Sequence, residues 1–434
     1  MMMAIWTNEQ LDAINGDGCS IMVSAAAGSG KTSVLVERLV RILSNAEYNV
    51  SADRMIVVTF TRDSASEMKQ RLIKAITQKM EQEPNNDWLS KQHSMLQNAK
   101  ISTIHSFCFD LIRDNINSLN LSPNFKIIEP TQEKMLCLKA TQDAIESMYK
   151  SNPEEMIFLS QSICDKTDDD LEKILIDLYE FLISVPFFED WFKSKCIDYY
   201  SKEDMFHDIA LDSVFNSQIE VLQQMISLSD KAIEICEQSD DENALNILQQ
   251  ENDFFIRCID ILKSKDRFDL DILKSMDSFK FQSLRFAKDN IFKESIRKYR
   301  DDYKTLIIKN TKINFSILID VIENYSQDKA TNKRVSIILL DLIKNIHENL
   351  RQIKIEENVL GFSDAEQIAI QLLATKDING SIVQSELAKN LSEYYQIIMI
   401  DEFQDSNNNQ DLIFKMLSKG GTFEKMGYNM FVVG

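Results

Sequence analysis

Short apolar runs alternate with helical patterns at both ends of the chain. Five of these runs predict buried strands: Ser20–Ser24, Met55–Phe60, Lys100–Thr103, Gln396–Ile400 and Asn429–Val433. Helices are predicted between them, over Lys31–Leu43, over Asp63–Met80 with a cap at Asp63 or Ser64, and over about ten residues from Asn408. Strands that alternate with helices in this way form a parallel sheet covered by helices.

The middle of the chain has a different pattern. It contains no glycine between Gly30 and Gly361. Apolar residues recur there at the spacing of a helix face, and one such set is Phe315, Leu318, Ile319 and Ile322. Because glycine is common in tight turns, a stretch without glycine is expected to contain few of them. We therefore expect an α/β domain in two parts, residues 1–117 and 361–434, interrupted by a large all-helical insertion domain of residues 118–360.

The composition is that of a soluble protein. Hydrophobic residues make up 44% of the chain, and apolar runs such as Ile397–Ile400 are far shorter than the ~20 residues that cross a bilayer. The start of the chain lacks a basic segment followed by an apolar stretch, so no secretory leader is predicted. The seven cysteines are scattered without a Cys-x-x-Cys pair, which argues against a zinc site or a disulfide framework. We expect a cytoplasmic protein without membrane contact.

The net charge of −20 argues against a protein that coats nucleic acid by bulk electrostatic attraction. The acidic excess is uneven, because residues 1–130 hold 13 Lys and Arg against 14 Asp and Glu. A polyanion would therefore have to bind in a local groove within the near-neutral part of the chain.

A turn between the first predicted strand and its helix has the features of a phosphate-binding loop. It consists of Ala25-Ala26-Ala27-Gly28-Ser29-Gly30-Lys31-Thr32. Small residues let backbone N–H groups close around phosphate oxygens at the positive end of a helix. Lys31 would contact the β- and γ-phosphates of ATP, and Thr32 would ligate Mg²⁺. The strict pattern has glycine in place of Ala25.

An acidic pair follows the predicted strand near the other end of the chain. Ile397–Ile400 leads into Asp401-Glu402-Phe403-Gln404-Asp405, which places two carboxylates at the carboxyl edge of the sheet. Asp401 would hold Mg²⁺ through water, and Glu402 would orient and deprotonate the attacking water. The alternative is an acidic start of the next helix. Roughly 370 residues separate this pair from the phosphate loop, far more than one α/β domain needs between core strands.

Three further segments narrow the class of protein. They are Trp6-Thr7-Asn8-Glu9-Gln10, Val57-Val58-Thr59-Phe60-Thr61 with Ser64-Ala65-Ser66-Glu67-Met68, and Ile101-Ser102-Thr103-Ile104-His105-Ser106-Phe107-Cys108. Together with the phosphate loop and the acidic pair, they resemble the ordered motifs of superfamily 1 DNA helicases of the UvrD/PcrA/RecB group. Within that group the resemblance is to the AddA family, the helicase-bearing chains of helicase–nuclease complexes. It covers residues 5–130 and 358–434, and the middle matches only in kind and length.

The resemblance implies an ATP-dependent DNA helicase that moves 3′ to 5′ and contains a P-loop RecA-like domain. Gln10 would contact the adenine, and Gln404 would join the phosphate loop in binding the nucleotide. Lys31, Asp401 and Glu402 would be the catalytic residues. Other residues would line the path of single-stranded DNA, namely Thr59, Phe60, Thr61, Arg62, Thr103, His105 and Ser106.

The DNA contacts implied by the resemblance agree with the chemistry of these side chains. Hydroxyl groups can bond phosphate oxygens, and the ring of Phe60 offers a stacking surface for a base. The alternatives are a core aromatic for Phe60 and a helix-start histidine bonded to backbone for His105. Arg62-Asp63 replaces a mostly Asn-led pair of the family, although Arg62 can itself bind phosphate. Gly361-Phe362-Ser363-Asp364 resembles the family's Asp-Phe-x-Asp element but lacks its first aspartate, and Asp364 is kept as a candidate.

The resemblance also implies partners and further domains. Single-stranded and duplex DNA would be substrates, and the nuclease protein AddB would complete a heterodimer that acts in double-strand break repair and recombination. In the family, the chain continues past the equivalent of Phe431–Gly434 into a second motor domain with arginine fingers and then a nuclease domain. Losing an arginine finger typically costs about 10³–10⁵ in rate. We expect an N-terminal fragment that binds ATP weakly and neither hydrolyses it well nor unwinds DNA.

Three alternatives compete with this interpretation. A stand-alone UvrD-like repair helicase is one, although the Trp-Thr start, the triple alanine and the Thr-Ile-His-Ser-Phe-Cys run favour AddA. A structural ATPase with a coiled-coil arm also splits its nucleotide motifs, but it needs sustained heptads and a Ser-Gly-Gly signature, and the sequence has neither. The third is a non-catalytic nucleotide-binding module in which Lys31 and Glu402 are relics.

Overall fold

The computed structural model describes residues 6–17, 20–26, 28–119, 121–164, 168–201, 208–239, 241–287, 290–308 and 315–434. The chain divides into two compact units. The first comprises Met1–Lys193 and Ile338–Gly434, and the second comprises Ser194–Ile337. Ala27 of the predicted phosphate loop lies outside the described residues.

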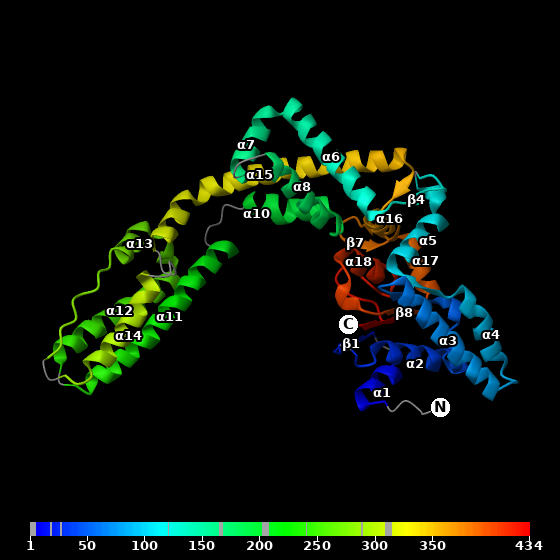
Figure 1. Ribbon diagram of the computed structural model, residues 1–434, viewed down its shortest axis with the longest axis horizontal. Coiled ribbons are helices and arrows are strands. Elements are labelled where there is room, and N and C mark those ends of the chain that lie inside the picture. The colour runs from blue at the N-terminus through cyan, green and yellow to red at the C-terminus, as the bar shows by residue number, and fades with distance from the viewer. Residues whose placement is uncertain are drawn as a thin grey trace. The chain divides into compact units, whose positions relative to one another are not determined.

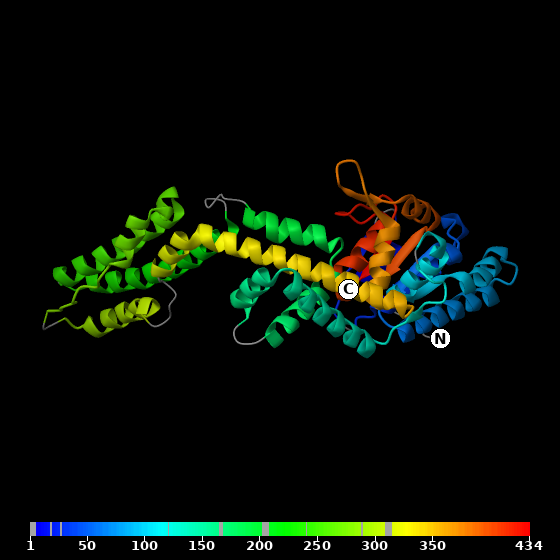
Figure 2. The same ribbon diagram turned by 90° about the horizontal axis from the view of Figure 1, so that it is seen from above.

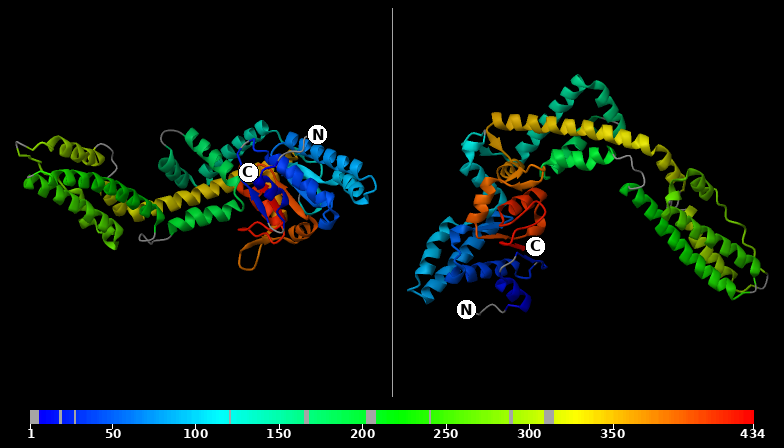
Figure 3. Two further views of the ribbon diagram at one scale, coloured as in Figure 1. Left: turned by 90° about the horizontal axis from the view of Figure 1, so that it is seen from below. Right: turned by 180° about the vertical axis from the view of Figure 1, so that it is seen from behind.

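A five-stranded parallel sheet forms the centre of the first unit (Figure 1). Its strands follow the spatial order β1 (Ile21–Val23), β9 (Met430–Val433), β8 (Ile397–Ile400), β2 (Met55–Thr59) and β3 (Lys100–Thr103). The first and last strands of the chain, blue and red in Figure 3, are neighbours, with Ile21 opposite Phe431. The five strands coincide with the five predicted apolar runs. The predicted α/β class with a parallel sheet is confirmed.

Helices cover both faces of this sheet because successive strand residues point to opposite sides. Met55 and Val57 face a core shared with α1 (Asn8–Asn15), α2 (Lys31–Ser44) and α3 (Arg62–Gln82). Ile56 and Val58 face a second core, shared with α5 (Ile104–Asp114), α16 (Phe362–Leu373), α17 (Glu386–Tyr394) and α18 (Asn408–Leu417). Both faces are therefore buried, as the continuous apolar runs require.

The first helix after β2 begins earlier than predicted. α3 starts at Arg62, and Thr61 is its N-cap. The Thr61 hydroxyl oxygen accepts a hydrogen bond from the backbone N–H of Ser64 at 3.1 Å. The predicted cap at Asp63 or Ser64 is therefore wrong, because Thr61 already satisfies an N–H group of the first turn from an extended backbone conformation.

A short parallel pair, β4 (Lys126–Ile127) with β5 (Val359–Leu360), joins two segments that lie close to the predicted ends of the helical insertion. Helices α6 (Pro130–Ser151), α7 (Pro153–Ile163) and α8 (Asp168–Ile183) lie between them in the chain and belong to the first unit. A small antiparallel hairpin follows later, from β6 (Ala374–Lys376) and β7 (Ile382–Gln384). The predicted domain boundaries after residues 117 and 360 stay a prediction.

The second unit is built from helices. It contains α10 (Asp198–Ser201), α11 (Ile209–Glu237), α12 (Glu242–Lys263), α13 (Leu270–Asp277), α14 (Lys293–Ile308) and the start of α15 (Phe315–Glu356). Helices α11, α12 and α14 pack side by side (Figure 2), and Phe215, Phe255 and Tyr303 are fully buried. α15 is 42 residues long, yet neither it nor any other helix in the described ranges is apolar enough to cross a membrane.

Candidate functional site

The turn from β1 into α2 has the backbone of a phosphate-binding loop. Gly28 and Gly30 adopt φ angles of 80° and 85°, a left-handed conformation that side-chain-bearing residues rarely adopt. Gly30 is also the N-cap of α2 and offers no side chain to the first N–H groups of the helix. Those groups, at the positive end of the helix dipole, suit an anion such as phosphate.

The two predicted halves of the site meet at the carboxyl edge of the sheet. The Thr32 hydroxyl donates a hydrogen bond to Asp401 Oδ2 at 3.1 Å. The Lys31 Nζ atom lies 3.5 Å from Glu402 Oε2. Both contacts follow from the strand order, since β9 alone separates β1 from β8. Residues 369 positions apart in the chain thus lie in one cluster.

Asp401 is a buried carboxylate with an unused oxygen. Its exposed fraction is 6%, and Oδ1 has no hydrogen-bond partner among the described residues. Burial raises the pKa of Asp401, against the opposing effect of the Thr32 hydrogen bond. A buried charge with an unpaired oxygen is unfavourable unless a cation or water completes it. Mg²⁺ prefers oxygen ligands, so the Asp401 carboxylate and the Thr32 hydroxyl could hold it.

Glu402 has an unusual backbone conformation for a glutamate. Its φ of 56° and ψ of 44° lie in the left-handed region, which costs about 1–2 kcal/mol for an L-residue. Its side chain is 40% exposed. The Gln404 side-chain amide donates to Glu402 Oε2 at 2.5 Å and to Asp405 Oδ2 at 3.4 Å. Gln404 therefore orients the carboxylate of Glu402 beyond the end of β8.

Gln10 braces the phosphate loop. Its amide nitrogen donates to the Ser29 carbonyl oxygen at 2.9 Å, and its amide oxygen accepts from the Thr7 N–H at 2.9 Å. The second bond belongs to a capping box that starts α1. On the other side of the loop, the Ala25 N–H donates to the carbonyl oxygen of Gly434 at 3.2 Å. A contact of Gln10 with adenine stays a prediction.

Five of the residues predicted to line the path of single-stranded DNA border one open groove of about 670 Å³ in the first unit. They are Phe60, Arg62, Thr103, His105 and Ser106. Phe60 is 58% exposed, which excludes the alternative of a core aromatic. Arg113 and Phe362 also line the groove, together with acidic residues Asp110 and Glu129. The groove thus combines an exposed ring with cationic side chains, as binding of a single strand requires.

The hydroxyl groups of this region have structural partners. Thr59 is buried, lies outside the lining of the groove, and donates to the Thr61 carbonyl oxygen at 2.9 Å. Thr103 caps α5 by accepting from the Ser106 N–H at 3.3 Å, and the two hydroxyls lie 2.9 Å apart. These bonds fix the turns from β2 and β3 into their helices, and any contact of Thr59 or Thr61 with DNA stays a prediction.

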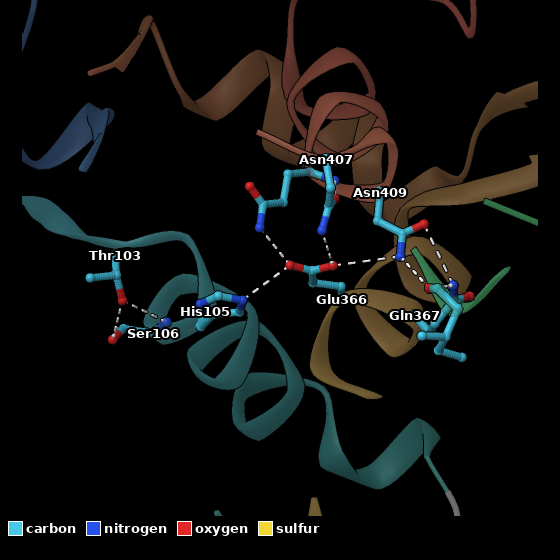
Figure 4. Close-up of polar contacts among 9 residues, drawn as sticks. Thr103, His105, Ser106, Glu366, Gln367, Asn407 and Asn409 are labelled. Atoms are coloured by element: carbon cyan, nitrogen blue, oxygen red, sulfur yellow. Dashed lines mark hydrogen bonds and ion pairs between the residues drawn. The ribbon is translucent and has the colours of Figure 1, made fainter. Parts of the chain in front are cut away.

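His105 contacts a side chain rather than the backbone. Its Nε2 atom lies 3.1 Å from Glu366 Oε1 (Figure 4). The centroid of its ring lies 4.6 Å from that of Phe362. Sequence reasoning did not find Glu366, because no spacing relates it to His105. Asp364 has another role, since it accepts from the Gly361 N–H and from buried Lys354, both at 2.7 Å.

Comparison with known proteins agrees with these motifs. The chain matches the UvrD/REP helicase N-terminal domain over residues 6–434. It is 32% identical to the ATP-dependent helicase/nuclease A-subunit of Acetivibrio thermocellus, a match that covers 99% of this chain and 34% of that protein. Proteins of the same name from Clostridium beijerinckii and Bacillus pumilus are 31% and 29% identical, over 99% of this chain and 34% and 35% of their own lengths.

The chain therefore spans about a third of the length of the curated relatives that it matches. The match over residues 6–434 includes both halves of the nucleotide motif and the helical segments between them. The resemblance drawn from the motifs is confirmed at the level of the family. This chain belongs to the UvrD/REP helicase N-terminal domain family.

Proposed function

We propose that this chain carries the ATP site of an AddA-type protein, an ATP-dependent DNA helicase that moves 3′ to 5′ within a helicase–nuclease of double-strand break repair and recombination. The observation that carries the proposal is the meeting of Lys31 and Thr32 with Glu402 and Asp401 at one sheet edge. The names of the relatives support the assignment to the helicase–nuclease.

In this proposal the phosphate loop binds the triphosphate of ATP. The small residues of the loop, from Ala25 to Gly30, leave room for the phosphates beside the start of α2, and Lys31 contacts the β- and γ-phosphates. Thr32, and Asp401 through water, would hold Mg²⁺, which would neutralise charge on the phosphates. Gln10 positions the loop for the nucleotide.

Glu402 acts on the attacking water. Its exposed carboxylate accepts the proton as water attacks the γ-phosphorus, while the bond from that phosphorus to the β,γ-bridging oxygen breaks and ADP leaves. Gln404 holds the carboxylate of Glu402 in place. Lys31 pairs with Glu402 in the structure, so binding of ATP exchanges one ionic partner of Lys31 for another.

Single-stranded DNA lies in the groove in this proposal. Phe60 stacks on a base, while Arg62, His105 and Ser106 contact the phosphate backbone. The near-neutral charge of residues 1–130 permits such a local polyanion site within an acidic chain. Duplex DNA and the nuclease protein AddB are further proposed partners, and we propose a cytoplasmic location. We also keep the division into a motor domain of residues 1–117 and 361–434 around an insertion of residues 118–360.

Phe60→Ala is expected to weaken single-stranded DNA binding about tenfold. One base stacked on an aromatic ring contributes about 1–3 kcal/mol, and 1.4 kcal/mol corresponds to a factor of ten. The measurement is fluorescence anisotropy of a labelled oligothymidine with the wild-type and variant chains. Phe423→Ala, which removes a ring that is 44% exposed elsewhere in the first unit, is the matched control and should bind as wild type. An unchanged affinity of Phe60→Ala would remove this ring from the DNA site.

A further inference from the structure

The first unit contains a buried carboxylate to which the proposed mechanism gives no task. Glu366 lies on α16, and its exposed fraction is 2%. Burying an ionised carboxylate is costly unless hydrogen-bond donors surround it. Figure 4 shows Glu366 between His105 of α5 and the amide groups at the start of α18.

Four side chains surround the carboxylate of Glu366. His105 Nε2 and the Gln410 amide nitrogen lie 3.1 and 2.6 Å from Oε1. The Asn407 and Asn409 amide nitrogens lie 3.0 and 3.5 Å from Oε2. Burial opposes ionisation of Glu366, but the hydrogen bonds from His105, Gln410 and Asn407 outweigh it and lower its pKa. An ionised carboxylate accepts only, so the Nε2 atom of His105 carries a proton.

α16 holds the His105 ring in two ways. Phe362 packs against the ring, and Glu366 accepts from its Nε2 atom. These two residues are four positions apart, so they lie on the same face of the helix. The imidazole keeps 33% of its surface exposed, and His105 lines the groove. Glu366 therefore sets the tautomer and the orientation of a side chain that faces the groove.

The other partners of Glu366 lie at the start of α18, a few residues after Glu402 of the nucleotide site. Asn407 caps α18 by accepting from the Gln410 N–H at 2.9 Å. Only the short 3₁₀ turn of Phe403–Asp405 and Ser406 lie between Glu402 and this cap. A movement of the chain at the end of β8 would therefore displace Asn407, which is only a few residues away. Asn407 and His105 both contact the Glu366 carboxylate, so the movement would also be transmitted to His105.

We propose that Glu366 is a positioning residue that ties His105 in the groove to the start of α18, and so links the affinity for nucleotide to the affinity for single-stranded DNA. The proposal rests on the proposed function, because it needs both ligands to bind. The coupling is reciprocal: if bound nucleotide changes the affinity for DNA by some factor, bound DNA changes the affinity for nucleotide by the same factor.

The test is the DNA affinity of the 434-residue chain with and without a non-hydrolysable ATP analogue and Mg²⁺. The ratio of the two affinities measures the coupling. In the wild type we expect a ratio of at least about fivefold, the lower end of ordinary coupling. Glu366→Gln should bring the ratio below about twofold, because an amide accepts at one atom only and must turn its NH₂ group toward a donor.

Asn407→Ser provides a second break in the same chain of bonds. Serine keeps an oxygen that can cap α18 but removes the amide that donates to Glu366, so it should also reduce the ratio. Gln384→Ala is the matched control, since Gln384 donates to the Met416 and Ser418 carbonyl oxygens at the other end of α18. Its ratio should stay at the wild-type value.

A double-mutant cycle separates positioning from general loss of stability. If Glu366 acts through His105, then adding Glu366→Gln to His105→Ala should weaken DNA binding less than about twofold further. A wild-type ratio of one, or a wild-type ratio in Glu366→Gln with both ligands still bound, would overturn the inference and leave the proposed function standing. Failure of the wild type to bind the ATP analogue or the oligothymidine would instead count against the proposed function.

Discussion

Glu402→Gln is expected to lower DNA-stimulated ATP hydrolysis by about 10²–10⁴-fold, the usual contribution of a positioned general base. The amide keeps the size of the side chain and cannot take a proton from water. The backbone at residue 402 is in the left-handed region, and Gln404 contacts the side chain there. We therefore expect the substitution to remove the proton acceptor without moving the side chain. The measurement is steady-state phosphate release, with saturating oligothymidine, by the protein expressed from its complete gene.

Nucleotide affinity provides the control for that substitution. Glu402→Gln should bind a fluorescent ATP analogue within about fivefold of wild type, since the Glu402 side chain is 40% exposed and such a partly exposed ion pair contributes about 0–1 kcal/mol. Glu424→Gln, an exposed glutamate of the same unit, should hydrolyse ATP at the wild-type rate. Undiminished hydrolysis by Glu402→Gln would exclude Glu402 as the base.

Lys31→Ala is expected to weaken binding of the ATP analogue by about 100-fold. Hydrogen bonds to charged groups contribute about 1.5–3 kcal/mol each, and Lys31 is placed to reach two phosphates. Its side chain is only 12% exposed, so water compensates poorly for its loss. The measurement is a fluorescence titration in the presence of Mg²⁺.

The control for Lys31 is a lysine on the surface of the same unit. Lys139→Ala, on the exposed face of α6, removes an equal charge and should leave the affinity unchanged. The same variant corrects for any effect of net charge on the binding of an anion. An affinity of Lys31→Ala within about threefold of wild type would mean that the turn after β1 is not the phosphate site.

The strands and the nucleotide site were predictable because their signals are local. Met55–Thr59 and Ile397–Ile400 are continuous apolar runs, and a strand buried on both faces needs such a run. The glycines of the phosphate loop adopt a left-handed backbone, and glycine is the residue that adopts this conformation most readily. Parallel strands then bring their carboxyl ends to one edge, so the approach of Thr32 to Asp401 follows from topology.

Other features depend on packing that no local pattern records. β4 and β5 are two residues long each, and their pairing joins segments from opposite ends of the helical region. Thr, Asp and Ser are all good helix caps, so residue type alone did not distinguish Thr61 from Asp63 or Ser64. Thr61 is the cap because its backbone is extended and its hydroxyl reaches the N–H of Ser64. Glu366 is 261 positions from His105, and only the folding of α16 against α5 brings them together.

The central claim is that two segments at opposite ends of the chain form one Mg²⁺–ATP site, and Asp401→Asn tests it most directly. The neutral amide suits a buried position where burial already opposes the charge. The measurement is the affinity of the 434-residue chain for a non-hydrolysable ATP analogue, with Mg²⁺ and with EDTA. We predict tighter binding with Mg²⁺ in the wild type and a loss of about 10–100-fold in that Mg²⁺ effect in Asp401→Asn. The same Mg²⁺ effect in both proteins would contradict a shared site.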